Sequence, residues 1–169
     1  MYCAFAFANQ QTHAQVDVGA ISLVSPVSPM CATAFQNITV SIKNYSAATI
    51  NFAVDSVTVT VNITGANAQS LTTTLTSGTL VSGGFQDVIV TTTTDMNIAG
   101  TSTFNAFTAV TGDANPANDA LIPAINITVN PNPAAAVGPD KIICTGDSTT
   151  IGAASVAGST YKWYDINFN

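Results

Sequence analysis

Apolar and polar residues alternate in several short stretches of this chain, which is the pattern of β-strands that bury one face. The clearest examples are QNITVSIKN at 36–44 and SVTVTVNITG at 56–65. In both stretches the apolar positions are β-branched and the alternate positions carry mainly hydroxyl or amide groups. We expect the following side chains to point mostly inward: Ile38, Val40, Ile42, Val57, Val59, Val61, Ile125 and Ile127.

Weaker strand signals recur between Val16 and Val129, in the stretches 16–24, 71–75, 85–92, 101–110 and 125–129. No window shows apolar residues at helical spacing. About seven short strands with turn residues between them favour two sheets packed face to face. The sequence therefore predicts an all-β fold, an Ig-like antiparallel β-sandwich over residues 16–129, with a β-barrel as the alternative.

The chain changes character after this region. Residues 130–140, NPNPAAAVGPD, contain three prolines, which remove backbone donors and interrupt strands, so we expect a linker. Strand-like segments resume within 141–169. Because an Ig-like sandwich needs roughly 80–100 residues, we expect an incomplete second Ig-like domain there, and a separate leading segment at 1–15.

Charged residues are scarce. They make up 7% of the 169 residues, against roughly 25% in ordinary globular proteins. Three lysines and nine aspartates are the whole set, and the net charge is −6. The chain lacks the basic surface that nucleic-acid binding requires, and it has no basic amphipathic stretch or long apolar run for membrane insertion. A surface this poor in charge favours an extracellular protein covered by sugar or by neighbouring subunits.

Four motifs resemble the CARDB-like Ig modules of long secreted proteins from Bacteroidota. They are VTVTVNITG at 57–65, SGTLVSGG at 77–84, AGTSTFNAFTAV at 99–110 and GDANPAND at 112–119. The later segments VGPDKIICTGDSTTI and YKWY are similar to the opening of PKD-like repeats in gliding adhesins of the same group. The resemblance implies export by the type IX route and an adhesive or spacing role at the cell surface. The further cysteine and strands that complete such a repeat are absent from this sequence.

The sequence contains no recognisable catalytic constellation. His13 is its only histidine, and no serine or cysteine motif accompanies it. A catalytic triad would therefore have to be built around a residue of the leading segment. We predict a protein that is not an enzyme, with no catalytic residues and no cofactor.

The three cysteines, Cys3, Cys31 and Cys144, do not have the spacing of a zinc site, and only one histidine could join them. In an exported protein such cysteines are disulfide candidates. Their odd number leaves one thiol over, which could pair with another chain. Several pairings remain open, because the spacing does not select one.

Side-chain oxygens cluster at Asp113, Asn115, Asn118 and Asp119, within TGDANPANDA. Calcium takes six to eight hard oxygen ligands, so the cluster is a candidate calcium site. The same residues also favour a turn into the last strand, because Asp, Asn and Asn-Pro bond to nearby backbone. Since the cluster contains no glutamate, we prefer the turn and keep calcium as the alternative.

Short glycosylation motifs also occur. Ser56 and Ser148 each follow an aspartate and resemble the O-glycosylation acceptor of Bacteroidota, although chance explains such short matches equally well. Sugar at these positions would cover a surface that is short of charge. Asn44-Tyr-Ser46 is one of several matches to the N-glycosylation motif, which a chain rich in Asn and Thr produces by chance.

The leading residues MYCAFAFANQ alternate large and small side chains, which places Cys3, Phe5 and Phe7 on one face of a strand. Thr12-His13-Ala14 fits a signal cleavage site, but no basic region precedes it. The segment is therefore either signal-like or a donor strand that pairs with a sheet of another copy, and we expect the donor strand. Head-to-tail donation of this kind does not close on itself, so it builds filaments. The alternative is that the chain is a fragment of a longer multi-repeat adhesin.

Two functions follow from these patterns. The first is a structural subunit of a surface filament or stalk, whose partners are other copies or neighbouring Ig-like repeats. The alternative is an adhesive module that recognises a glycan or another surface ligand through its loops. Aromatic residues that could form a carbohydrate platform stand at strand spacing, so we assign them to the core: Phe52, Phe85, Phe104, Phe107 and Tyr45.

Overall fold

The computed structural model describes residues 15–132 and 144–145. The chain divides into two compact units, Met1–Pro131 and Asn132–Asn169, and all the strands described below belong to the first. Most of the predicted leading segment, most of the predicted linker and nearly all of the predicted second Ig-like domain lie outside the described residues. The description below therefore concerns the sandwich.

Short strands separated by turns make up this unit, as the alternating pattern predicts. In chain order they are β1 (Val18–Ser25), β2 (Met30–Cys31), β3 (Thr33–Asn44), β4 (Ile50–Asn51), β5 (Val57–Gly65), β6 (Gln69–Leu75), β7 (Thr79–Leu80), β8 (Phe85–Met96), β9 (Gly100–Val110) and β10 (Ile125–Asn130). A 3₁₀ turn, η1 (Pro116–Asn118), lies in the connection between β9 and β10.

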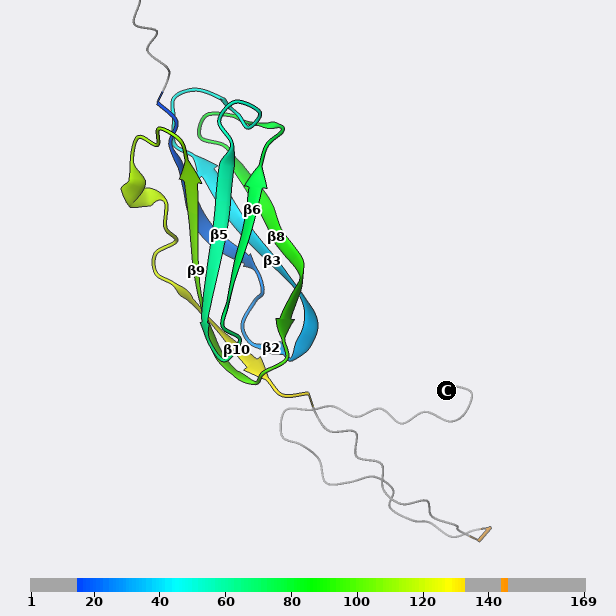
Figure 1. The fold of residues 1–169 in the computed structure, drawn as a ribbon. Helices are drawn as coiled ribbons and strands as arrows, with labels where there is room; N and C mark the ends of the chain where they lie inside the picture. Colours follow the sequence, from blue (N-terminus) through cyan, green and yellow to red (C-terminus); the bar gives the residue numbers. More distant parts are fainter. Residues whose placement is uncertain (1–14, 133–143, 146–169) are drawn as a thin grey trace, which may run out of the picture. The chain divides into compact units, whose positions relative to one another are not determined.

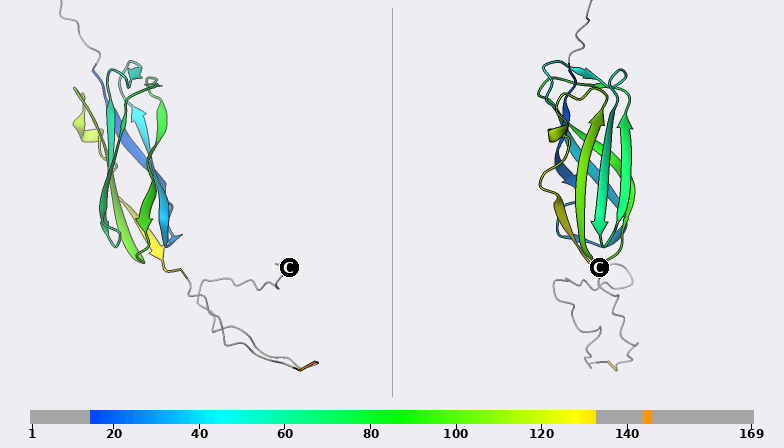
Figure 2. Two further views of the ribbon diagram at one scale, coloured as in Figure 1. Left: turned by 45° about the vertical axis from the view of Figure 1, so that its right-hand side comes forward. Right: turned by 60° about the vertical axis from the view of Figure 1, so that its left-hand side comes forward.

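Two sheets pack face to face (Figures 1 and 2). One has the strand order β1-β3-β8, the other has the order β2-β10-β9-β5-β6, and β4 pairs with β7 in a small ribbon. Neighbouring strands are antiparallel except β2, which runs parallel to β10. The two main sheets remain separate, so the predicted all-β Ig-like sandwich is confirmed and the barrel alternative is wrong.

The core lies between the sheets and consists mainly of β-branched side chains. Seven of the eight residues predicted to point inward are at most 1% exposed, and Ile125 is half-buried at the start of β10. Phe52 and Phe104 are the largest fully buried side chains. The register of the strands is well fixed, because a slip of one residue would turn a whole buried set toward water.

Three of the five aromatic residues assigned to the core lie elsewhere. Phe85 and Tyr45 are 62% and 43% exposed, and Phe107 is half-buried at an outward position of β9. Phe85 and Tyr45 flank Lys43, whose Nζ lies 4.6 Å from the ring centre of Tyr45 and 5.3 Å from that of Phe85. The core prediction failed for these two because a cation held between two aromatic faces stabilises them at the surface.

The chain enters and leaves the sandwich at opposite ends. Figure 1 shows the start of the described chain at one end, and β10 running out at the other. The connections also divide between the ends, with η1 near the first and the turn from β8 to β9 near the second (Figure 1). Each end therefore presents its own group of loops.

Candidate functional site

The connection between β9 and β10 brings several polar side chains onto the start of β1. Val16 forms an isolated bridge with Asp113, and the amide of Ala114 donates a 2.8 Å hydrogen bond to the carbonyl of Val16. The predicted oxygen cluster thereby meets Asp17, which lies nearly a hundred residues earlier in the sequence. We call Asp17, Asp113, Asn118 and Asp119 the acidic cluster.

Asp113 uses both of its carboxylate oxygens to hold backbone. Its Oδ1 accepts a 2.7 Å hydrogen bond from the amide of Asn115, which is the geometry of an Asx turn. Its Oδ2 accepts a 3.4 Å hydrogen bond from the amide of Val18. Asn115 itself is exposed and contributes its carbonyl to the amide of Asn118, over 3.1 Å. These contacts are those expected of a turn that is fastened to β1.

Asn118 and Asp119 continue this attachment. The Asn118 amide nitrogen Nδ2 donates a 2.9 Å hydrogen bond to Oδ1 of Asp17. The carbonyl of Asp119 accepts from the amides of Ala20 and Thr108, over 3.2 and 3.1 Å. A Cβ at Gly19 would clash with the carbonyl oxygen of Asn118, so a glycine is needed where the connection crosses β1.

The surroundings of Asp119 in the acidic cluster disfavour the ionised form of its carboxyl. Burial, followed by the negative charges of Asp113 and Asp17, raises the pKa of its carboxyl above the ordinary value of 3.8. Oδ1 of Asp119 and Oδ1 of Asn118 are also buried without a hydrogen-bond partner. A proton or a cation would relieve this repulsion, so the acidic cluster is a candidate site.

The described residues offer little support for a bound metal ion. Among residues 15–132 and 144–145, no group of three or more His, Cys, Asp or Glu side chains is placed to hold one. Asp113 is engaged by two amides and the Asn118 amide by Asp17, so their preferred partners are already present. The contacts agree with the preferred turn interpretation, and calcium binding stays the alternative.

A shallow hollow of about 370 Å³ lies between the β5–β6 turn and the β8–β9 turn. One lining residue, Asn67, joins the two turns, because its Nδ2 donates to the carbonyl of Ile98 over 2.9 Å and its Oδ1 accepts from the amide of Ile98 over 3.0 Å. Asp95 is the only ionisable residue in the lining. The carboxylate of Asp95 and the hydrogen-bonded side-chain amide of Asn67 do not form a catalytic pair. The residues of this hollow hold the two turns together.

The remaining predicted site residues are not brought together in the described part of the chain. Cys31, at the end of β2, and Cys144 are exposed thiols without a disulfide bond, and Ser56 is exposed just before β5. His13, Ser148 and the donor-strand residues lie outside the described residues, the last being Cys3, Phe5 and Phe7. The disulfide, glycosylation and donor-strand assignments therefore stay predictions.

Asn44 shows why one glycosylation motif is a chance match. Its side chain is fully buried, and Nδ2 donates to the carbonyls of Ala48 and Leu80 over 2.9 and 2.8 Å. Its Oδ1 accepts from the amide of Ser46 over 2.8 Å and from the Ser46 hydroxyl. An amide committed in this way has no room for a sugar.

The part of the chain that the structure describes contains no helix long and apolar enough to cross a membrane. Two polar arrangements there, the acidic cluster and Asn67, both support turns. Neither combines a nucleophile with a base that could activate it.

No protein-family model matches the chain, and no curated protein matches it. Among solved structures, the CARDB domain of a Pyrococcus furiosus protein, determined in complex with di-metal ions, is 17% identical with a TM-score of 0.46 and covers 69% of this chain and 90% of its own. The alkylpurine DNA glycosylase AlkC of Pseudomonas fluorescens, bound to DNA containing an abasic site analogue, is 14% identical with a TM-score of 0.37. That match covers 69% of this chain and 30% of the glycosylase.

Proposed function

We propose that this protein is a non-catalytic structural module of a linear assembly on the outside of the cell. The observation that carries the proposal is that the described chain enters the sandwich before β1 at one end and leaves it after β10 at the other (Figure 1). A domain with this geometry separates whatever precedes it from whatever follows it by its full length. That is the requirement for a repeating unit in a stalk or filament.

The use of the polar groups supports a structural role. Asn44, Asn67 and the acidic cluster make their hydrogen bonds within their own domain, mainly with its backbone. The scarcity of charge supports an environment in which sugar or neighbouring subunits cover the surface. The motif resemblance to CARDB-like modules of Bacteroidota surface proteins supports export by the type IX route.

Strand donation is the proposed mode of assembly. The alternation of Cys3, Phe5 and Phe7 gives the leading segment one large apolar face. Burying two phenylalanines against a neighbouring sheet contributes roughly 1.5–3 kcal/mol for each side chain that is fully covered. Added to the backbone ladder of a paired strand, this is sufficient to join copies of the chain head to tail.

The test is the particle size of the full chain and of two matched double variants. Sedimentation velocity and electron microscopy should show filaments for the natural sequence. The variant with Phe5→Asp and Phe7→Asp should remain monomeric. The control with Phe35→Asp and Phe85→Asp places the same two charges at residues that are 76% and 62% exposed in the sandwich, and it should still assemble. A monomeric natural chain, or normal filaments from the first variant, would show the proposal to be wrong.

A further inference from the structure

The outer face of the five-stranded sheet is free of charge. Strands β2, β10, β9, β5 and β6 contain no Asp, Glu, Lys, Arg or His at any position. Their outward positions carry hydroxyl and amide groups almost throughout. We call the following residues the neutral face: Thr58, Thr60, Asn62, Thr64, Ser70, Thr72, Thr74, Thr103, Asn105, Phe107 and Asn126.

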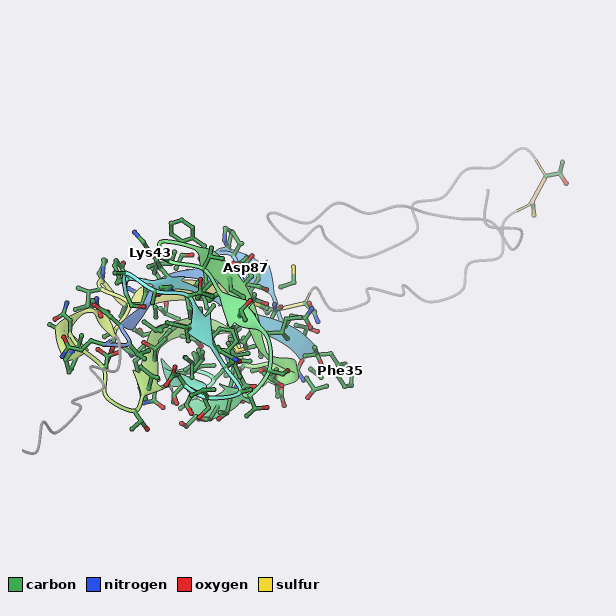
Figure 3. All side chains as sticks on the ribbon, turned by 90° about the horizontal axis from the view of Figure 1, so that it is seen from above. Phe35, Lys43 and Asp87 are labelled. Carbon is green, nitrogen blue, oxygen red and sulfur yellow. The ribbon has the colours of Figure 1, made fainter. Side chains whose placement is uncertain are left out.

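This neutrality is a property of one sheet and not only of the overall composition. The opposite sheet carries Lys43 on β3 and Asp87 on β8, and Figure 3 shows both on that side of the domain. It also exposes the apolar side chains of Phe85 and Ile89. The two outer surfaces therefore differ in chemistry, and only one is a continuous array of uncharged hydrogen-bonding groups.

Hydrogen bonds between neighbouring strands fix many of these side chains. The hydroxyls of Thr58 and Thr74 lie 3.1 Å apart, and those of Thr60 and Thr72 lie 3.2 Å apart. Oγ of Ser70 on β6 donates to Oδ1 of Asn62 on β5 over 2.7 Å. Side chains held in this way lose little rotamer freedom when a ligand binds, which lowers the cost of association.

Phe107 is the one aromatic residue of the neutral face. It stands opposite Thr60 of β5, and Asn105, two residues earlier on the same strand, stands opposite Asn62. The ring is half-buried at an outward position of β9, so part of it still offers surface. An apolar ring surrounded by uncharged donors and acceptors matches a sugar, which has an apolar ring face and hydroxyls at its edge.

We propose that the neutral face binds an uncharged polysaccharide lying across strands β6, β5 and β9. The absence of charge argues for a neutral ligand, because acidic polymers would require cations that this sheet lacks. The breadth and regular spacing of the array argue for an extended chain of sugars. This binding site lies on a sheet face, whereas the sequence-based expectation of an adhesive module placed recognition on the loops.

The test is retention of the full chain by insoluble cellulose, chitin and β-1,3-glucan, and in parallel by the acidic polymer alginate, at low and high salt. We expect at least one neutral polymer to bind independently of salt and alginate not to bind. The face variant, Thr72→Asp with Asn105→Asp, should weaken that binding at least about tenfold, because it brings unpaired charges into the contact. The control, Thr93→Asp with Asn37→Asp, makes the same two exchanges at exposed positions of the opposite sheet and should bind normally.

Circular dichroism should show the same thermal unfolding for both variants, because all four positions are exposed. Failure of every neutral polymer to retain the natural chain would overturn the proposal. Equal losses in the face variant and the control would also overturn it. Self-association that disappears only in the face variant, without sugar binding, would show that a second copy covers this face instead.

Discussion

The hydroxyl of Thr108 donates a 2.6 Å hydrogen bond to the carbonyl oxygen of Val18, and this bond connects the two sheets through the core. Thr108 lies on β9 and Val18 on β1, and both residues are almost fully buried. A polar contact in this position satisfies a backbone group that no water can reach. It also fixes how β1 lies against the opposite sheet.

Replacing Thr108 with valine keeps the shape of the side chain and removes the donor. We expect the free energy of unfolding of the sandwich to fall by about 1–3 kcal/mol, because a buried carbonyl loses its partner. Urea unfolding, followed by the far-ultraviolet circular dichroism of the backbone, measures the change in the free energy of unfolding. Thr128→Val, at an exposed position of β10, is the control and should change the stability by less than about 0.5 kcal/mol. Equal effects of the two exchanges would contradict the role assigned to Thr108.

Asn44→Ala should be more damaging than Thr108→Val. The exchange leaves the carbonyls of Ala48 and Leu80 and the amide of Ser46 without their partner in a buried region. We expect a loss of about 3 kcal/mol or more in the free energy of unfolding. Asn37→Ala, on an exposed position of the same strand, should be close to neutral. A stable Asn44→Ala protein would mean that water replaces these contacts.

Asp119→Asn should stabilise the sandwich at neutral pH. Burial and the charges of Asp113 and Asp17 raise the pKa of Asp119, so the folded state holds this proton more tightly than the unfolded state. The stability of the natural protein therefore decreases as the pH rises from the unfolded-state value of 3.8 through the folded-state pKa. The gain in stability from Asp119→Asn should be largest above that pH range and should disappear below it.

Thermal unfolding of the natural protein and the Asp119→Asn variant across this pH range tests the expectation. Asp87→Asn, an exposed carboxylate on β8, controls for the removal of one negative charge from an acidic protein. A gain that is the same for both exchanges would indicate net charge as the cause. A loss of stability in Asp119→Asn at neutral pH would show that the ionised carboxylate is favourable.

Calcium should leave the melting temperature of the sandwich unchanged if the loop between β9 and β10 is only a turn. A site filled at about one hundred times its dissociation constant would add about 2.7 kcal/mol to stability, which is easily detected. The comparison is thermal unfolding in excess calcium, in excess magnesium and with a chelator. A rise specific to calcium that Asp113→Asn abolishes would establish the calcium interpretation instead.

Strand alternation predicted the core well, because each strand has one apolar side. Ile38, Val40 and Ile42 are recognisable from sequence for this reason. In FQDVIV both sides are partly apolar, so the alternation does not tell which of Phe85 and Val88 is inside. Val88 is buried with the core, while Phe85 lies beside Lys43 at the surface. The two-residue strands β2, β4 and β7 are too short to leave any periodic signal.

The candidate sites were less predictable because they depend on contacts between distant residues. Asp113, Asn118 and Asp119 were identified from their spacing, but Asp17 joins them only through the docking of a loop on β1. Thr108 carried a signal that can be recognised in retrospect, since it follows Phe104 and Ala106 at the spacing of one buried face. The neutral face could not be predicted from the sequence, because it depends on the strand order, which places five uncharged strands side by side.

The positions of β1 and β10 determine how the sandwich would respond to mechanical force. Because the chain leaves from opposite ends, tension between them acts along the strands (Figure 1). β1 would then slide against β3, and β10 against both β9 and the parallel strand β2, with several hydrogen bonds loaded at once. Shearing such ladders requires more force than opening them one bond at a time from an end. The topology thus gives the module a resistance to stretching that depends on direction.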